Sequence, residues 1–268
     1  MASKNPTATP SLVVKIGGSI LGSEDTTLED LVALQKRGAI PVVVHGGGQV
    51  ISEWMGKVGA QPQFVRGLRV TDAASMEIVS AVLCGLVNKE LVSSIQSLGG
   101  RALGMSGVDG CMLQGRILDP DLGLVGQVVQ VDPDPILGAL AAGYMPVIAP
   151  VAVHVMDSSE HSGMLLNVNG DTAAGEIARA LKAESMVFLT DVEGVLNSDQ
   201  SLISSLTTEE GQALIQSGTV AGGMAPKVEA CLRALEGVMV SQIADGRKSR
   251  VLLDFVEGRP SGTRIGQA

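Results

Sequence analysis

Aromatic residues are scarce in this sequence. The 268 positions hold five of them: Trp54, Phe64, Tyr144, Phe188 and Phe255. Bases of single-stranded nucleic acids stack on aromatic side chains, so this chain offers almost no platform for them. A formal charge of −9 and a pI near 4.8 point the same way, because nucleic-acid phosphates bind basic surfaces. We therefore expect no nucleic-acid partner.

Cysteine is scarce as well, and long apolar runs are missing. Cys84, Cys111 and Cys231 are far apart, odd in number and without histidine neighbours. They predict reduced core residues of a cytoplasmic protein, and neither a disulfide nor a metal site.

No apolar run approaches the length of a membrane span, so we expect no membrane partner. Residues 1–11 are mostly polar and lack the apolar centre of a signal peptide, which predicts a loose N-terminal tail.

The common nucleotide-binding signatures are also absent. The chain has neither a Walker A pattern nor the Gly-x-Gly-x-x-Gly fingerprint, so a P-loop and a conventional dinucleotide site are both unsupported. The three histidines, His45, His154 and His161, lack the spacing of zinc ligands. Candidate chemistry therefore rests on lysines and on glycines at loop ends.

One such lysine lies near the amino end, in the segment Leu12–Ser19, which reads LVVKIGGS. A short apolar run followed by glycine predicts a buried strand that leads into a tight loop. Lys15 inside that strand requires an anionic partner if it is buried. Gly17 and Gly18 lack a Cβ, so their N–H groups can surround phosphate oxygens. Alternatively, Lys15 reaches water at the strand end beside an ordinary turn.

A second strand and glycine loop follow. Ile40–Val44 predicts a buried strand, His45 and three glycines (46–48) come directly after it, and apolar residues at helical spacing run from Val50 to Val58. Two strand–loop–helix units in succession are typical of a parallel sheet, whose ligands bind at the carboxyl ends of the strands. We expect His45 to hold the loop by hydrogen bonds rather than to act as a base.

Further along the chain, the pattern predicts mainly alternating helices and strands. We expect a lobe boundary near residues 180–185, with an N-terminal lobe over 12–183 and a C-terminal lobe over 184–268. The predicted elements are a helix from Thr71 or Asp72 to about Leu98, hairpins in 111–131 at one sheet edge, a helix over 135–142, a strand over 147–156, a helix that residues 167–171 open and that runs to about Leu181, a strand over 186–190, and helices over 207–217 and 228–236.

Lys227 is the most informative residue of the C-terminal part. Pro226 suits the first position of a helix, which places Lys227 in the first turn. A cation there opposes the helix dipole at a cost of roughly 0.3–1 kcal/mol, and Gly222 and Gly223 precede it. An anion held by Lys227 and the helix N-terminus would explain the arrangement; an exposed lysine that bends back to water is the alternative.

Four polar residues are further candidates. Asp171 either caps its helix or holds two lysines apart. Arg69 either binds a substrate carboxylate through its guanidinium or lies on the surface. Asn167 and Asn169 either donate to a ligand or stabilise the turn before Asp171.

Together these segments resemble the amino acid kinase family, and within it the acetylglutamate branch. The resemblance runs from Val13 to Ile265. Its motifs, in order, are VVKIGGS (13–19), VVHGGG (43–48), GLRVTDAASMEIV (67–79), NVNGDTAAGEIA (167–178), LTDVEGVL (189–196) and GGMAPKVEACLRALEG (222–237).

The resemblance implies an α/β fold of three layers around a mostly parallel central sheet, with two lobes. The N-terminal lobe would bind N-acetyl-L-glutamate and the C-terminal lobe ATP with Mg²⁺, which the nucleotide carries. ATP would phosphorylate the γ-carboxylate, a step of arginine biosynthesis. That carboxylate is ionised at neutral pH, since its pKa is about 4.3, so no general base is needed. Phosphoryl transfer mainly requires positioning and charge neutralisation.

The resemblance also assigns roles to individual residues. Lys15 and Lys227 would stabilise the transferring phosphoryl group, and Asp171 would orient both. The remaining assignments are N–H donors at Gly17, Gly18, Gly46 and Gly47 for phosphoryl and substrate, Arg69 and Asn167 for substrate, and Asp191, Gly194, Leu196, Thr219 and Ala221 for the nucleotide.

The chain departs from the family pattern at several points. Gly170 stands where the family commonly has alanine. Only a short tail precedes Val13, and Gln242 stands where the arginine-inhibited branch has a histidine. We therefore predict a homodimer without arginine feedback. Binding of a PII-type regulatory protein has no support in the sequence.

Two alternative functions stay open at this point. One is a sister kinase acting on a glutamyl or aminoadipyl group carried by a small acidic protein, which a charge of −9 makes less natural. The other is a non-catalytic sensor of nucleotides or amino acids, which has no need of both Lys15 and Lys227. Uridylate and aspartate kinases of the same family resemble this sequence less.

Overall fold

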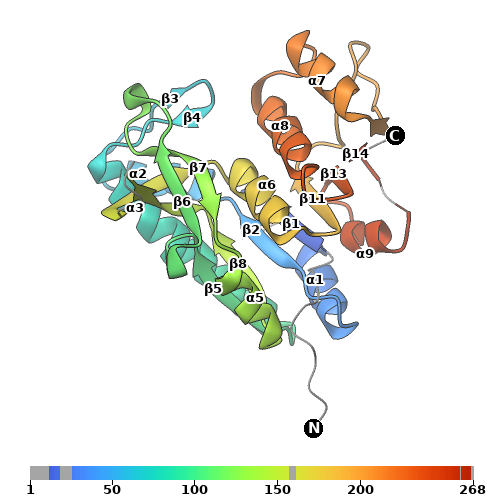
Figure 1. Cartoon of the computed structure of the whole chain (residues 1–268), viewed down its shortest axis with the longest axis horizontal. Coiled ribbons are helices and arrows are strands. Elements are labelled where there is room, and N and C mark those ends of the chain that lie inside the picture. Colours follow the sequence, from blue (N-terminus) through green and yellow to red (C-terminus); the bar gives the residue numbers. More distant parts are fainter. Residues whose placement is uncertain (1–11, 19–25, 157–160, 260, 267–268) are drawn as a thin grey trace.

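The computed structural model describes residues 12–18, 26–156, 161–259 and 261–266. A central sheet of eight strands organises the molecule (Figure 1). Its strands are β1 (Leu12–Ile16), β2 (Val42–His45), β5 (Ala102–Ser106), β8 (Met145–Ala149), β11 (Ser185–Thr190), β12 (Ser205–Leu206), β13 (Val240–Asp245) and β14 (Thr263–Gly266). Their order is β12-β14-β13-β11-β1-β2-β8-β5, and every neighbouring pair except β13–β14 is parallel.

Helices cover both faces of this sheet, as the three-layer prediction requires. They are α1 (Thr27–Lys36), α2 (Gly48–Lys57), α3 (Ala73–Ser80), a π-helical segment η1 (Ala81–Val87), α4 (Asn88–Ser97), α5 (Asp134–Ala141), α6 (Gly170–Leu181), α7 (Thr208–Gln216), α8 (Ala225–Ala234) and α9 (Val251–Val256). Short 3-10 turns are η2 (Asp109–Cys111), η3 (Pro120–Leu122) and η4 (Gly222–Met224).

The alternation of side chains along β1 divides the core into two clusters. Val13 joins the cluster that contains residues of α5, α6 and α8, whereas Val14 joins the cluster with residues of α1, α2 and α4. Side chains of a strand point to opposite faces in turn, so Lys15 shares the face of Val13. This places Lys15 on the side that α6 covers.

A smaller closed sheet stands beside the central one. It consists of β6 (Leu113–Ile117), β7 (Val125–Val131), β9 (Val151–Val155) and β10 (His161–Val168), and a separate hairpin joins β3 (Phe64–Val65) to β4 (Leu68–Arg69). The predicted hairpin in 111–131 is present as the antiparallel pair β6–β7, but it lies in this small sheet and not at the edge of the large one.

The single strand predicted over 147–156 is wrong. The chain forms two strands there, β8 in the central sheet and β9 in the small sheet, with Pro150 between them. Proline has no N–H to donate to a strand ladder, so it ends one pairing and lets the chain change sheets.

The long helix predicted to end near Leu98 is confirmed with an interruption. Asp72 caps it by accepting a hydrogen bond from the Ser75 N–H, and η1 separates α3 from α4. As one unit, Ala73–Ser97 is long and apolar enough to cross a membrane by length and composition, an exception to our expectation from apolar runs. Buried residues such as Val79 and Ile95 pack in the core, so this is weak evidence for a span.

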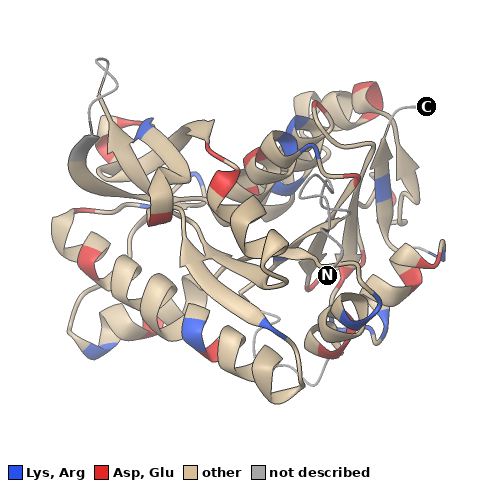
Figure 2. Ribbon diagram, turned by 60° about the horizontal axis from the view of Figure 1, so that its bottom comes forward, with Lys and Arg blue, Asp and Glu red and all other residues tan. Residues whose placement is uncertain are grey.

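Charged side chains are spread over helices and loops in the view of Figure 2, without one extended basic face. The parallel pair β1–β11 joins residues from both sides of the predicted lobe boundary at 183/184 within one sheet. The boundary itself stays a prediction.

Candidate functional site

Lys15 and Lys227 meet at one carboxylate. The Lys15 Nζ lies 2.6 Å from Oδ1 of Asp171, and the Lys227 Nζ lies 3.0 Å from its Oδ2. The side chains are 9%, 19% and 7% exposed for Lys15, Lys227 and Asp171. Burial acts to raise the pKa of the Asp171 carboxyl, but the two ammonium groups outweigh it and hold that pKa below its ordinary value. The carboxylate is therefore ionised, and each of its two oxygens is paired with one lysine ammonium group.

Of the two roles that the sequence leaves open for Asp171, that of helix cap is not the one the structure shows. Asn169 is the N-cap of α6, because its Oδ1 accepts hydrogen bonds from the N–H groups of Asp171 and Thr172. Asp171 lies in the first turn, where the helix dipole favours a negative charge. Its side chain is therefore free to face the two lysines.

Lys227 lies where the sequence places it, in the first turn of α8 after Pro226. Helices α6 and α8 lie side by side (Figure 1), and a Cβ on Gly175 would come within 2.8 Å of the Ala230 carbonyl oxygen. The ion pair of Lys227 with Asp171 joins the first turns of these two helices. The glycine at 175 therefore helps Lys227 to reach Asp171.

The two glycine loops pack against each other at the carboxyl ends of β1 and β2. The N–H groups of Gly17 and Gly46 donate to the backbone oxygens of Leu189 and Ile16. Those of Gly18 and Gly47 make no hydrogen bond within the described residues, and a Cβ on Gly18 would lie 3.2 Å from the Gly47 nitrogen. Of the four predicted donors, Gly18 and Gly47 therefore keep N–H groups for a ligand.

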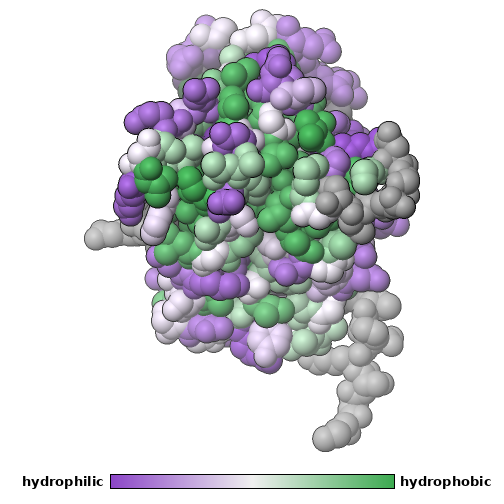
Figure 3. All heavy atoms as spheres, turned by 90° about the vertical axis from the view of Figure 1, so that its left-hand side faces the viewer, coloured by the Kyte–Doolittle hydropathy of each residue, from purple (hydrophilic) through white to green (hydrophobic). Residues whose placement is uncertain are grey.

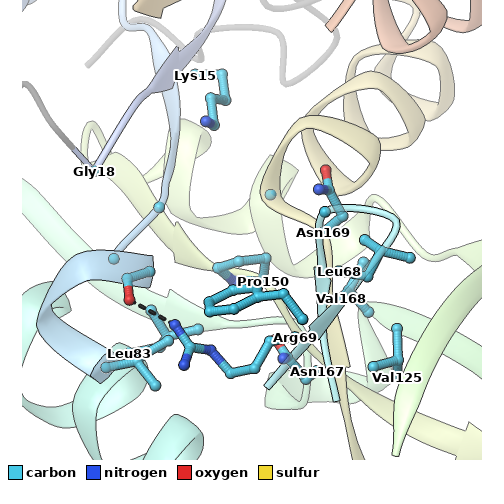
Figure 4. Close-up of a pocket in the computed structure, with 17 residues that line it drawn as sticks. Lys15, Gly18, Leu68, Arg69, Leu83, Val125, Pro150, Asn167, Val168 and Asn169 are labelled. Carbon is cyan, nitrogen blue, oxygen red and sulfur yellow. Dashed lines mark hydrogen bonds between the residues drawn. The ribbon is translucent and has the colours of Figure 1, made fainter. Parts of the chain in front are cut away.

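A cavity of about 220 Å³ opens beside these loops (Figure 4). Drug-sized ligands occupy roughly 300–1,000 Å³, so this space suits a small metabolite. Its charged lining is Lys15 and Arg69, and no Asp or Glu is among the described residues that line it. Its polar lining is Asn167, Asn169 and the glycines 18 and 46–48, and its apolar walls include Ile51, Leu68, Leu83, Val125, Pro150 and Val168.

Arg69 is buried without a carboxylate partner in the part of the chain that the structure describes. Its guanidinium donates to the Gly48 carbonyl oxygen at 2.7 Å and to the Ser52 Oγ at 2.8 Å, and it stacks on the Phe64 ring at 4.7 Å. Burial lowers its pKa from the ordinary value. A buried, anchored cation that faces a cavity is suited to bind an anionic ligand.

Asn167 reaches the same cavity from the end of β10. Its Nδ2 donates to the Thr71 Oγ1 at 3.1 Å, and the Thr71 hydroxyl in turn donates to the Arg69 backbone oxygen. Thr71 thus links Asn167 to the Arg69 backbone and fixes the two residues relative to each other. In Figure 4, Lys15 and Arg69 approach the cavity from opposite ends.

The five residues predicted for the nucleotide do not line this cavity. Asp191 follows β11 directly and is exposed at the sheet edge that also carries Gly17. Gly194 is buried, and a Cβ there would meet the Thr263 Oγ1 at 2.6 Å; Leu196 pairs with Leu202. Thr219 and Ala221 are exposed just before η4 and α8. Their contact with a nucleotide stays a prediction.

Sequence reasoning missed the residues that hold the site in place. Ser52 anchors Arg69, Thr71 anchors Asn167, and Asn88 donates to the His45 ring at 3.1 Å. Asn169, in contrast, is a candidate from the sequence for the turn before Asp171, where it carries a local signal because asparagine is a favoured N-cap. The other three contacts join distant parts of the chain, and no short pattern reveals them.

Comparisons with known proteins agree with this geometry. A profile described as "Amino acid kinase family" matches residues 10–245. The acetylglutamate kinase of Dehalococcoides mccartyi (strain CBDB1) is 42% identical over 257 residues, which covers 96% of this chain and 94% of that protein. The acetylglutamate kinase of Synechococcus sp. (strain WH7803) is 45% identical over 250 residues, which covers 90% of this chain and 83% of that protein.

A solved structure shares the fold. The structure of smu.665 from Streptococcus mutans UA159 aligns with a TM-score of 0.81 at 26% identity, and the match covers 97% of this chain and all of that one.

Proposed function

The chain belongs to the amino acid kinase family, and from that premise we propose that it transfers the γ-phosphoryl group of ATP to the side-chain carboxylate of N-acetyl-L-glutamate. The product is N-acetyl-L-glutamyl 5-phosphate, an intermediate of arginine biosynthesis. The names of relatives that are 42–45% identical over at least 90% of the chain support this activity.

The charge of the cavity lining is the observation on which we base the choice between N-acetylglutamate and free glutamate. Lys15 and Arg69 are its charged lining, and its described lining residues include no carboxylate. A free amino acid would bring an ammonium group into this space without a counter-ion, which costs several kcal/mol or forces the group to lose its proton. An N-acylated amino acid carries carboxylates and an uncharged amide instead. The lining therefore favours N-acetylglutamate over glutamate.

The transfer requires no proton acceptor. A carboxylate oxygen of the substrate attacks the γ-phosphorus, the new O–P bond forms, and the bond from that phosphorus to the bridging oxygen of ADP breaks. Charge builds on the oxygens of the transferring group, and Lys15, Lys227 and the N–H groups of Gly18 and Gly47 are the donors available to stabilise it. Arg69 and Asn167 would hold the substrate.

Mg²⁺ would enter with the nucleotide. Within the described residues no group of three or more His, Cys, Asp or Glu side chains is arranged to hold a metal ion. Bound to the phosphates, the ion would neutralise charge on them. We place the nucleotide against Asp191, Gly194, Leu196, Thr219 and Ala221, which lie at the sheet edge and before α8.

We also propose that two copies associate and that the enzyme works in the cytoplasm. Figure 3 shows apolar side chains gathered on the side of the molecule that carries α2 and the β3–β4 hairpin. Exposed large apolar residues of these elements are Trp54, Phe64 and Val65, and Val58 directly follows α2. Such a surface is typical of a protein contact. The free cysteines suit a reducing compartment.

The direct test is formation of an acyl phosphate, trapped with hydroxylamine, in the presence of ATP and Mg²⁺. N-acetylglutamate, glutamate, N-acetylaspartate and aminoadipate are compared as acceptors. We expect strong turnover with N-acetylglutamate and little with glutamate. Turnover with glutamate at a similar rate would contradict the argument from cavity charge. Silence on all four would favour a carrier-linked acceptor or a sensor.

A further inference from the structure

His45 is fully buried at the end of β2, directly before the glycine loop, and the phosphoryl transfer has no use for it as a base. Its Nδ1 lies 2.8 Å from the Gly46 carbonyl oxygen, and its Nε2 lies 3.1 Å from the Asn88 Nδ2. A carbonyl oxygen only accepts, and an amide nitrogen only donates. The ring is therefore neutral, with its proton on Nδ1 and an acceptor lone pair on Nε2.

The orientation of Asn88 is fixed by its other neighbours. Asn88 is fully buried at the start of α4, and its Nδ2 lies 2.8 Å from the Val147 backbone oxygen and 3.2 Å from that of Met105, so its two N–H protons are shared among these oxygens and the His45 ring. Its Oδ1 accepts from the Lys89 ammonium at 2.9 Å. The amide thus presents its nitrogen to His45 and ties the ring to β5, β8 and α4.

The bond from His45 to Gly46 also fixes the next N–H group. In a trans peptide the C=O of one residue and the N–H of the next point in opposite directions, and no cis peptide occurs in the described chain. Because the ring holds the Gly46 carbonyl, the Gly47 N–H faces away from the ring. That N–H has no partner within the described residues and lies beside Gly18, in the lining of the cavity with Lys15.

Leu83 packs close to Gly47 and leaves no space for a side chain there. A Cβ on Gly47 would come within 2.7 Å of the Leu83 Cδ2, and Leu83 belongs to the π-helical segment η1. Segments of π-helix frequently occur at functional sites. The peptide between Gly46 and Gly47 therefore has His45 bonded to its carbonyl oxygen and Leu83 packed close to Gly47.

We propose that His45 is a positioning residue: its Nδ1–H tautomer, selected by Asn88, holds the Gly46 carbonyl so that the Gly47 N–H faces the transferring phosphoryl group. The role of Gly47 rests on the proposed function, whereas the tautomer does not. Burial lowers the pKa of His45 to about 4, and the charges of Lys15 and Lys89 act in the same direction. A proton on Nε2 would face the Asn88 amide nitrogen, which only donates and cannot accept it.

The tautomer can be measured without turnover. The chain has three histidines, so ¹⁵N-labelled imidazole signals of the full-length protein can be assigned with the His45→Asn variant. We expect one neutral ring with its proton on Nδ1 that does not titrate from about pH 5.5 to 9, unlike an exposed histidine with a pKa near 6.5. A proton on Nε2, or a ring that becomes charged in this range, would overturn the proposal.

Two variants then separate the two ring nitrogens. In His45→Asn the amide nitrogen takes the place of Nδ1 and keeps a donor for Gly46, whereas His45→Gln places its amide at Nε2 and loses that donor. Removal of one donor to developing charge costs about 100- to 1,000-fold in kcat, so a donor left in place but misdirected is expected to cost roughly 10- to 100-fold. We expect that loss in His45→Gln, with little change in KM for the acceptor, and most of kcat retained in His45→Asn.

The outcomes are distinguishable. Equal kcat losses in both variants, or no loss in His45→Gln, would overturn the positioning role. Urea midpoints of both variants show whether a loss of activity follows from unfolding. If the wild-type protein phosphorylates none of the tested acceptors, the proposed function fails, and the NMR measurement still decides the tautomer.

Discussion

At the scale of single residues, Asp171 has two separable effects, one on stability and one on turnover. Its pKa in the folded protein lies below the ordinary value of 3.8 because Lys15 and Lys227 outweigh its burial. A carboxyl group with a lowered pKa contributes stability above the pKa of the unfolded chain. This contribution disappears as the pH falls through the lower, folded pKa.

Asp171→Asn tests the effect on stability. The change leaves two poorly exposed ammonium groups without their counter-ion, so we expect the free energy of unfolding at pH 7 to fall by about 3 kcal/mol. Urea unfolding at several pH values measures it. The gap between wild type and variant should narrow below about pH 4, where the Asp171 carboxyl of the unfolded wild-type chain takes up its proton while that of the folded protein is still ionised. A gap that is constant from pH 7 to 3 would contradict this explanation.

Glu176→Gln is the matched control for turnover. Glu176 lies on the same helix, is equally buried at 7% exposure, and also pairs with two cations, Arg179 and Arg233, but within the described residues it forms no ion pair with Lys15 or Lys227. We expect Asp171→Asn to lower kcat by about 100-fold or more, because both lysines lose their orientation. Glu176→Gln should lower stability and spare kcat. Comparable kcat losses in the two variants would show that stability alone explains the effect.

Gly170→Ala, unlike the two preceding substitutions, is expected to raise the stability of the protein. A Cβ there would lie 3.5 Å from the Lys15 Cε and 3.6 Å from the His45 carbonyl oxygen, which are ordinary contacts. Alanine restricts the unfolded chain, so we expect a gain of about 0.4–1 kcal/mol, a rise of up to about 4 °C in Tm, and unchanged kcat. Calorimetry and a turnover assay measure both. A loss of stability would show that the turn requires glycine.

At the scale of elements, the sequence predicts what local periodicity determines. The strand around Lys15 and both strand–glycine–helix units follow from patterns a few residues long, and the structure confirms them as β1 with α1 and β2 with α2. Candidate cavity residues such as Arg69 and Asn167 were also named from the sequence, through motifs of the family.

The parts that the sequence could not predict depend on non-local contacts. Whether Asn169 or Asp171 caps α6 is decided by the lysines, since Asp171 turns toward Lys15 and Lys227 and leaves the capping position to Asn169. Likewise, Pro150 can indicate that a strand ends, but the residues around it do not reveal that the next strand joins a different sheet.

The contact between α6 and α8 can be tested with two glycines. Gly175→Ala would press a methyl group within 2.8 Å of the Ala230 carbonyl oxygen, whereas Gly138→Ala on α5 meets nothing within 4 Å. We expect Gly175→Ala to cost about 1–3 kcal/mol of unfolding free energy and to lower kcat, because it moves Lys227 relative to Asp171. Gly138→Ala should add up to about 1 kcal/mol in a urea titration. Equal effects would contradict a close helix contact.

At the scale of the whole molecule, an acidic protein binds two anionic substrates. The formal charge is −9, yet the cations of the site converge at the carboxyl ends of the strands and the amino end of α8. Exposed charges further apart than about 8–10 Å are largely screened at physiological salt. The buried lysines of the site are screened much less, so local geometry and not net charge determines which anions bind.

The oligomeric state is the last property to test. The exposed apolar residues of α2 and the β3–β4 hairpin, together with Val58 directly after α2, are the proposed dimer interface and the place for substitutions. Burying such side chains between two copies is favourable by about 25 cal/mol per Å² of apolar surface, so we expect a mass twice that of the 27.5 kDa chain in light scattering. Val58→Asp places a charge in this surface and should give monomers. Met239→Asp is the control, because Met239 is 73% exposed and lies between α8 and β13.

Regulation by arginine is tested on the same samples. Gln242, at the position where the arginine-inhibited branch has a histidine, is fully buried and donates to the Ser261 carbonyl oxygen, so it presents no side chain to a ligand. We therefore expect millimolar arginine to change neither turnover nor mass. A hexamer whose turnover falls with arginine would contradict both expectations. A dimer that Val58→Asp leaves intact would contradict only the location of the interface.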